Sequence, residues 1–179
     1  MIEDTIVKQV DISSERLKLR PLRKSDEGLL TLYAGDTRVA KTTRSIPHPL
    51  PPGASEAFIA RSTSDGRRED VWAMDASHVG LSELLGVIGL TRLSEDRSEI
   101  NYWVAPAFWN TGFATEAVTA ILAANPQGVK TIFAEVFQSN AVSARVLTNA
   151  GFDYIGDAEA FSVAQNRSVP TWTYLKKLA

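Results

Sequence analysis

The chain has 179 residues, 44% of them hydrophobic, with a formal net charge of −2 and a pI near 5.7. This length predicts a single domain over residues 1–179. The slightly negative charge provides no positive surface field that would attract nucleic acid, so we predict no nucleic-acid partner. The sequence has no cysteine and only two histidines, which excludes disulfides and thiolate ligands and predicts no metal site.

The N-terminus shows no targeting pattern, because Met1–Lys8 lacks a basic start followed by an apolar run. No other stretch approaches the ~18 apolar residues of a membrane span. We therefore predict a soluble, cytoplasmic protein without a membrane partner, in which residues 1–14 form a loose lead-in. The sequence leaves open whether the protein forms a homodimer.

The first third of the chain predicts one strand and two helices. Residues 16–20 alternate polar and apolar side chains, as a half-buried strand does. Ser25 and the two acids after it begin a helix that ends near Gly35. Prolines between residues 45 and 53 predict a loop, which precedes a second helix near 54–62.

Strands then predominate. We expect strands at residues 71–75, 84–92 and 98–104, with polar turns at 64–70 and 93–97. The turn at 93–97 joins the last two of these strands.

Two strand–turn–helix units follow. The first helix begins after Gly112 and ends before Asn125. An apolar strand at 131–137 leads to the second helix, which begins at Asn140 and is capped by Gly151. Two final strands are expected at 162–164 and 171–178, around a turn at 165–168. This order suggests a mixed sheet covered by helices on both faces.

The helix after Gly112 offers a ready anion site. The unpaired N–H groups of a first helical turn and the positive end of the helix dipole favour phosphate oxygens. Gly112 allows the backbone to approach a ligand closely. The alternative is that Gly112 only serves a tight strand-to-helix turn.

The order and spacing of these pieces over residues 15–177 resemble the GNAT N-acetyltransferases, most closely the branch of the ribosomal-protein N-terminal acetyltransferases. The segments 104–117 and 140–152 are similar to the family's acyl-CoA-binding core, and 15–22 to its first strand. The resemblance implies the α/β acyl-CoA N-acyltransferase fold. That fold has a mixed, mostly antiparallel sheet of about seven strands, helices on both faces and a splay between the fourth and fifth strands.

The resemblance also implies acetyl-CoA as the acetyl donor. Its pyrophosphate would lie against backbone N–H groups near the turn, and its pantetheine between strands 99–104 and 131–137. The chain departs from the family at Asn110 and Thr111, where relatives often carry a basic residue or glutamine and a second glycine. The implied cofactor-binding residues are Trp103, Val104, Asn110, Thr111, Gly112, Phe113, Ala114, Thr115, Asn140 and Ser143.

Three catalytic roles follow from the same resemblance. The main-chain N–H near Val104 polarises the thioester carbonyl, Glu99 accepts the amine proton, and Ser143 protonates the leaving thiolate. Alternatively, Glu99 is an exposed strand acid beside Arg97, and Ser143 lies on a solvated helix face.

Other residues have two interpretations each. Asn140 contacts the cofactor, caps its helix, or does both. Arg145 reaches a cofactor phosphate or forms a surface ion pair, and His48 assists at the acceptor side or is simply exposed in the proline-rich loop. Three aromatic side chains fit the core better than an acceptor pocket: Trp72, Trp103 and Trp109.

The implied function is acetyl transfer from acetyl-CoA to a primary amine by direct attack in a ternary complex. The acceptor is left open among a protein N-terminus, an aminoglycoside, a polyamine and a small amine metabolite. The alternative of another class is a non-catalytic acyl-CoA sensor with the same fold. A doubly wound nucleotide site is disfavoured, because no Gly-x-Gly-x-x-Gly follows the first strand.

Overall fold

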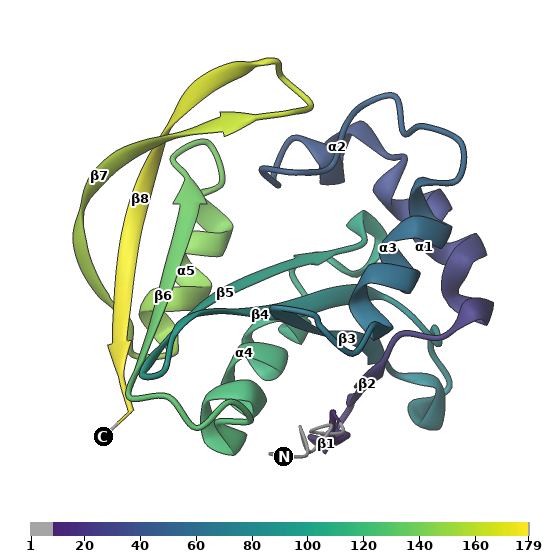
Figure 1. The fold of residues 1–179 in the computed structure, drawn as a ribbon, viewed down its shortest axis with the longest axis horizontal. Coiled ribbons are helices and arrows are strands. Elements are labelled where there is room, and N and C mark those ends of the chain that lie inside the picture. The colour runs from purple at the N-terminus through teal and green to yellow at the C-terminus, as the bar shows by residue number, and fades with distance from the viewer. Residues whose placement is uncertain (1–8, 179) are drawn as a thin grey trace, which may run out of the picture.

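The computed structural model describes residues 9–178, which form one sheet with helices on both faces (Figure 1). Within this range the sheet has eight strands in the order β1-β2-β3-β4-β5-β6-β8-β7. The strands are β1 (Ile12–Ser13), β2 (Lys18–Pro21), β3 (Glu69–Asp75), β4 (Gly86–Ser94), β5 (Arg97–Val104), β6 (Thr131–Phe137), β7 (Asp153–Ser162) and β8 (Arg167–Lys177). The α-helices are α1 (Glu27–Ala34), α2 (Thr37–Ala40), α3 (Ala54–Thr63), α4 (Phe113–Ala124) and α5 (Ala141–Asn149).

Two hydrophobic cores lie on opposite faces of the sheet. The larger core packs α4 and α5 through side chains such as Ile121 and Leu147. The smaller core packs α1 and α3 through Leu30 and Ile59, on the face that carries Trp103. Figure 1 shows the two helix pairs on either side of the central strands. The predicted mixed sheet with helices on both faces is therefore confirmed.

The sheet opens between β5 and β6. These strands run parallel and pair only where Arg97–Glu99 faces Thr131–Phe133, although β5 continues to Val104 and β6 to Phe137. On its other edge β6 pairs with β8 along its whole length, from Thr131 to Phe137. The splay implied by the resemblance is therefore present, and it leaves the end of β5 facing the start of α5.

Several predicted boundaries were wrong. The strand expected at 162–164 is β7, which spans 153–162, and its turn lies at 163–166. Most β7 side chains are exposed, because β7 is the outer strand of the sheet, so its sequence lacks a regular apolar alternation. The turn between β4 and β5 shrinks to residues 95–96. The sequence also gave no sign of α2.

The predicted loose lead-in is only partly described, since residues 1–8 lie outside the described range. Residues 9–14 are held in place. β1 pairs with β2, Gln9 Nε2 donates to Val71 O at 2.7 Å, and Trp72 Nε1 donates to Val10 O at 2.9 Å. None of the described helices is long and apolar enough to cross a bilayer.

A buried ion cluster joins the sheet to the first helical segment. Arg20 on β2 donates through Nε to Asp75 on β3 at 2.8 Å, and through both terminal nitrogens to Asp26 at 2.8 and 2.9 Å. The side chain of Arg20 is 7% exposed, that of Asp26 1% and that of Asp75 8%. We call these three residues the buried cluster.

Candidate functional site

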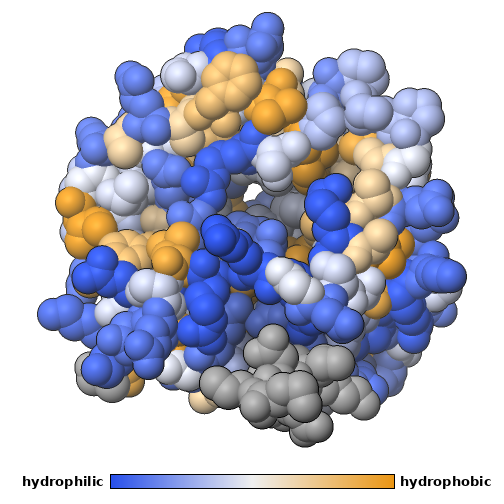
Figure 2. Space-filling model, viewed as in Figure 1, coloured by the Kyte–Doolittle hydropathy of each residue, from blue (hydrophilic) through white to orange (hydrophobic). Residues whose placement is uncertain are grey.

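Two cavities meet at the opening between β5 and β6. The larger measures about 920 Å³ and lies on the side of α1 and α3, and the smaller measures about 310 Å³ and lies at the start of α4. Figure 2 shows the molecule hollowed near the middle of this view, with mostly hydrophilic residues around the hollow. The residues that line both cavities are Thr42, Tyr102, Trp103, Asn140 and Ser143. Two molecules, one bound in each cavity, would therefore come together beside these side chains.

The smaller cavity is built on the first turn of α4. Gly112 is the N-cap with φ of 82°, and Asn110 takes a φ of 60°, a left-handed conformation that asparagine tolerates better than most residues. The first helical hydrogen bond runs from Glu116 N–H to Gly112 O. The N–H groups of residues 113–115 are therefore left without intrahelical partners and can bind an anion.

All ten residues proposed as cofactor-binding line this cavity, Trp103 and Val104 at the end of β5 included. Trp109 also lines it, although the sequence analysis favoured the core for this residue; it is 41% exposed. Its Nε1 donates to Val104 O at 2.6 Å and so fixes the turn against the end of the strand.

A cation that the sequence analysis missed lies against the turn. Arg16 donates from Nη1 to Thr111 O at 3.0 Å, and its guanidinium carbon is 4.1 Å from the centre of the Phe113 ring. Its Nε donates to Glu116 at 2.8 Å, and Ser14 also donates to that carboxylate at 2.6 Å. Burial alone would raise the pKa of Glu116, but these hydrogen bonds hold it below its usual value. Nothing in the sequence links Arg16 to a turn 95 residues away.

A second cation lies on α5. Arg145 lines the smaller cavity and is exposed. Within residues 9–178 it makes no ion pair, so the structure does not support the surface ion pair considered from sequence. The uncharged stretch at Asn110 and Thr111 is thus flanked by two arginines from other elements.

Ser143 and Tyr102 form a hydroxyl pair between the cavities. Ser143 Oγ donates to Tyr102 Oη at 2.9 Å, and Tyr102 Oη donates to Ser143 O at 3.2 Å. Ser143 is 8% exposed, which excludes the solvated helix face considered from sequence. Burial raises the pKa of the Tyr102 hydroxyl well above its ordinary value, so that hydroxyl stays protonated at neutral pH. Asn140 caps α5, with Oδ1 accepting from Ser143 N–H at 3.4 Å, and it also lines both cavities.

Other candidates separate in the structure. Trp72 is 1% exposed and belongs to the core, as predicted. Trp103 belongs to the smaller core and also lines both cavities. His48 is exposed in the proline-rich loop and does not line either cavity.

An ion cluster lies where β5 and β6 separate. Two of its members, Arg44 and Glu135, line the larger cavity, whereas Glu99, the base proposed from sequence, is not among the lining residues. Arg44, in the loop after α2, forms ion pairs with Glu99 on β5 and with Glu135 on β6, the second at 3.0 Å. Glu135 also accepts from Thr171 Oγ1 at 2.9 Å. We call Arg44, Glu99 and Glu135 the open cluster, because their side chains are 40%, 22% and 16% exposed, respectively. Glu99 therefore pairs with Arg44, which the sequence analysis did not single out.

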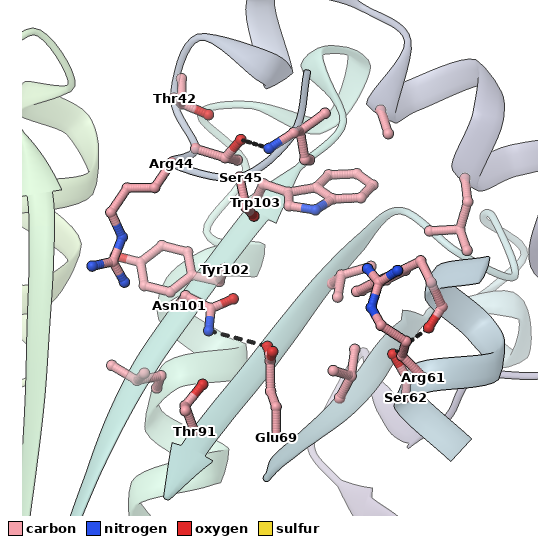
Figure 3. Close-up of a pocket in the computed structure, with 18 of the residues that line it drawn as sticks. Thr42, Arg44, Ser45, Arg61, Ser62, Glu69, Thr91, Asn101, Tyr102 and Trp103 are labelled. Atoms are coloured by element: carbon pink, nitrogen blue, oxygen red, sulfur yellow. Dashed lines mark hydrogen bonds between the residues drawn. The ribbon is translucent and has the colours of Figure 1, made fainter. Parts of the chain in front are cut away.

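Glu69, at the start of β3, lines the larger cavity and was also missed (Figure 3). It accepts from Asn101 Nδ2 at 3.3 Å. Burial raises its pKa above the ordinary value; the hydrogen bond from Asn101 and the charges of Arg61 and Arg44 oppose this rise. Within residues 9–178 no ion pair includes Glu69.

Comparison with known sequences identifies related proteins. A model of the acetyltransferase (GNAT) domain matches residues 16–153. An uncharacterized N-acetyltransferase, YoaA of Bacillus subtilis (strain 168), is 36% identical over 78 residues. That match covers 41% of this chain and 44% of the relative, so it spans less than half of either protein.

Solved structures share the fold. A spermidine N-acetyltransferase from Vibrio cholerae, in complex with CoA and spermine, superimposes with a TM-score of 0.77 at 15% identity, covering 92% of this chain and 97% of the other. The ribosomal-protein-S5-alanine acetyltransferase from Vibrio fischeri gives a TM-score of 0.75 at 17% identity, covering 94% and 97%. The names of these two proteins indicate different acceptors, so the shared fold does not select one.

Proposed function

Because this chain belongs to the acetyltransferase (GNAT) domain family, we propose that it transfers the acetyl group of acetyl-CoA to a primary amine by direct attack in a ternary complex. The observation that carries the proposal is the meeting of two cavities at the splay, with Tyr102, Asn140 and Ser143 in both. One cavity suits the thioester donor and the other suits the acceptor. Direct transfer requires both molecules to be bound together at such a junction.

The donor side rests on main-chain groups. The free N–H groups at the start of α4 suit the pyrophosphate, and each hydrogen bond to a charged acceptor is typically worth about 1.5–3 kcal/mol. Arg145 provides a charge for a cofactor phosphate from the wall of the same cavity. Pantetheine would then run along the open edge of β5 toward Val104, whose main-chain N–H polarises the carbonyl.

Protonation of the leaving thiolate falls to the hydroxyl pair. Ser143 and Tyr102 are buried at the junction and linked by hydrogen bonds of 2.9 and 3.2 Å. The Tyr102 hydroxyl stays protonated at neutral pH, and its hydrogen bond with Ser143 Oγ positions the serine at the junction. Ser143→Ala should therefore lower kcat more than it raises the KM for acetyl-CoA, and Tyr102→Phe should do the same to a smaller extent.

The acceptor is one of the four amines left open above. The larger cavity, at about 920 Å³, has room for any of them. Release of free thiol from acetyl-CoA, measured against a panel that holds an alanyl peptide, an aminoglycoside, spermidine and short alkylamines, tests the function. Thiol release that depends on one of these amines supports it. Binding of coenzyme A by calorimetry without any amine-dependent turnover overturns it in favour of the non-catalytic sensor.

A glycine substitution tests the donor site separately. Gly112→Val puts a branched side chain at a left-handed position, where its Cβ would lie 3.3 Å from Arg16 Nη2. We expect a higher KM for acetyl-CoA with a modest loss of Tm. Gly80→Val is the matched control, because Gly80 has a φ of 80°, nothing within 4 Å of a Cβ, and no part in either cavity. An equal KM in the two variants would count against the site.

A further inference from the structure

Two glutamates lie in one row on the acceptor face of the sheet. In the β-sheet register Glu69 on β3 is opposite Thr91 on β4, and Thr91 is opposite Glu99 on β5. Side chains alternate along a strand, so Glu99, Asn101 and Trp103 share the face on which Trp103 packs against α1 and α3. The backbones at Glu69 and Glu99 are two strand spacings apart, roughly 10 Å.

A glycine lets Glu69 reach across the sheet. Gly89 on β4 is opposite Asn101 on β5, and a methyl group on Gly89 would overlap Glu69 Oε1 and come within 3.3 Å of Asn101 Nδ2. The Glu69 carboxylate therefore occupies the space that a side chain at position 89 would take. Figure 3 shows Glu69 and Asn101 joined there, beside Thr91 and below Tyr102.

The two carboxylates differ in their counter-charges. Glu99 forms an ion pair with Arg44, which also pairs with Glu135. Glu69 has only the neutral Asn101 amide within hydrogen-bonding distance among the described residues. The charged groups that act on it are farther away: Arg61 on α3, Arg44, and the like charge of Glu99. Glu69 is thus the carboxylate of this face whose charge is least satisfied by the protein.

We propose that Glu69, held over Gly89 by Asn101, binds the acceptor as an ammonium ion and removes its proton, in place of Glu99. The inference rests on the proposed acetyl transfer. One proton passes from R–NH3⁺ to the Glu69 carboxylate, and the freed nitrogen lone pair forms the C–N bond to the thioester carbonyl carbon. The C–S bond breaks and sulfur leaves with its electron pair. The thiolate takes a proton from the hydroxyl pair, and the second proton of the nitrogen replaces it there. The proton on Glu69 then passes to solvent, so the reaction releases one proton in all.

This assignment makes the requirement for Glu69 depend on the basicity of the acceptor. An aliphatic amine arrives as an ammonium ion at neutral pH and must lose a proton before it attacks. A fluorinated analogue of similar size, such as 2,2,2-trifluoroethylamine beside ethylamine, arrives largely unprotonated. Glu69 is therefore needed for the first amine and largely bypassed by the second.

The experiment measures kcat/KM against pH for the wild type, Glu69→Gln, Glu99→Gln and Gly89→Ala, using the best amine of the panel and then the ethylamine pair. Glu56→Gln is the matched control, because Glu56 is exposed on α3 and does not line the larger cavity. We expect Glu69→Gln to lower kcat/KM for the aliphatic amine about 10²-fold and to remove the acidic limb of the profile. Gly89→Ala, which displaces the carboxylate without removing it, should fall between Glu69→Gln and the wild type.

The outcomes separate the two proposals. An acidic limb that persists in Glu69→Gln, or disappears in Glu99→Gln alone, overturns the assignment while acetyl transfer stands. An equal loss for ethylamine and its fluorinated analogue also overturns it. Absence of turnover in the wild type with every amine overturns the proposed function itself. A circular dichroism spectrum and Tm like those of the wild type establish that each variant is folded.

Discussion

The protein contains two clusters with the same composition, one arginine between two carboxylates, in opposite surroundings. In the buried cluster the Arg20 guanidinium makes three hydrogen bonds to Asp26 and Asp75 and two more to the carbonyls of Pro21 and Glu83. In the open cluster Arg44 makes one bond to each glutamate, and its side chain is 40% exposed at the mouth of a cavity.

The difference shows that burial, rather than residue type, decides what such a cluster does. A buried charge is costly unless every donor and acceptor is satisfied, so the buried cluster is fixed and serves the fold. An exposed pair contributes about 0–1 kcal/mol and is free to rearrange. The open cluster can therefore change partners when a charged acceptor enters, which the buried cluster cannot do.

The largest expected effect comes from breaking the buried cluster. Asp26→Asn removes the carboxylate that accepts two bonds from Arg20, and leaves a guanidinium 7% exposed with half of its charge pairing lost. We expect a loss of about 3–5 kcal/mol in the free energy of unfolding, measured by urea denaturation. A loss below 1 kcal/mol would mean that the two clusters are energetically alike.

Acid should also weaken the buried cluster. Burial alone would raise the pKa of Asp75, but hydrogen bonds from Ser77 and Arg20 hold it below its ordinary value. As the pH falls, Asp75 is therefore protonated in the unfolded chain before it is protonated in the folded protein. Its stabilising effect is full above the unfolded-state pKa of about 3.9 and is lost as the pH falls through the lower folded-state pKa. Urea midpoints between pH 6 and 3 should fall toward acid. Urea midpoints that do not change with pH would show that ionised Asp75 does not stabilise the folded protein.

Disrupting the open cluster should change catalysis more than stability. Arg44→Gln removes a partly exposed guanidinium, so the free energy of unfolding should fall by about 1 kcal/mol or less. Glu135 then lines the larger cavity without its cation, and we expect the KM for the amine to change while the KM for acetyl-CoA does not. Arg38→Gln is the control, since Arg38 pairs with Asp36 on the surface away from both cavities.

Salt should produce the smallest effect. At 1 M ionic strength the screening length falls to about 3 Å, which weakens exposed pairs and leaves buried ones largely intact. We expect the KM for the amine to rise with salt in the wild type and at least as steeply in Arg44→Gln, because the carboxylates that attract the ammonium ion have lost their cation. Stability, which depends on the buried cluster, should change little. The reverse pattern would contradict the contrast between the clusters.

Local patterns were enough to place most elements of the structure. The apolar run at 131–137 is β6, the helix after Gly112 is α4, and Gly35 ends α1. The same patterns failed for β7, which lies at the edge of the sheet with most side chains exposed and so carries little apolar alternation. Hydrophobic periodicity in a sequence reflects burial of one face, so it does not predict a strand whose side chains are mostly exposed.

The proposed donor side could be predicted from the sequence because it is built mainly from consecutive main-chain groups. The first turn of a helix has free N–H groups whatever lies elsewhere in the fold, so residues 110–115 could be proposed as an anion site from local sequence. Asn140 and Ser143 were implied by the resemblance of segment 140–152 to the family's acyl-CoA-binding core. Tyr102, the partner of Ser143, and Arg16, which donates to Thr111 O, were missed because they come from other parts of the chain.

The proposed acceptor side depends on tertiary structure alone. Glu69 and Arg44 look like ordinary surface charges in the sequence, and each contacts residues at least 30 positions away. The register of three strands places Glu69 beside Asn101 across Gly89, and a loop brings Arg44 to Glu99. The sequence by itself therefore determined most of the elements and the turn before α4, because these depend on neighbouring residues. Which charges face one another depends on how the strands align, and that was settled only by the packed sheet.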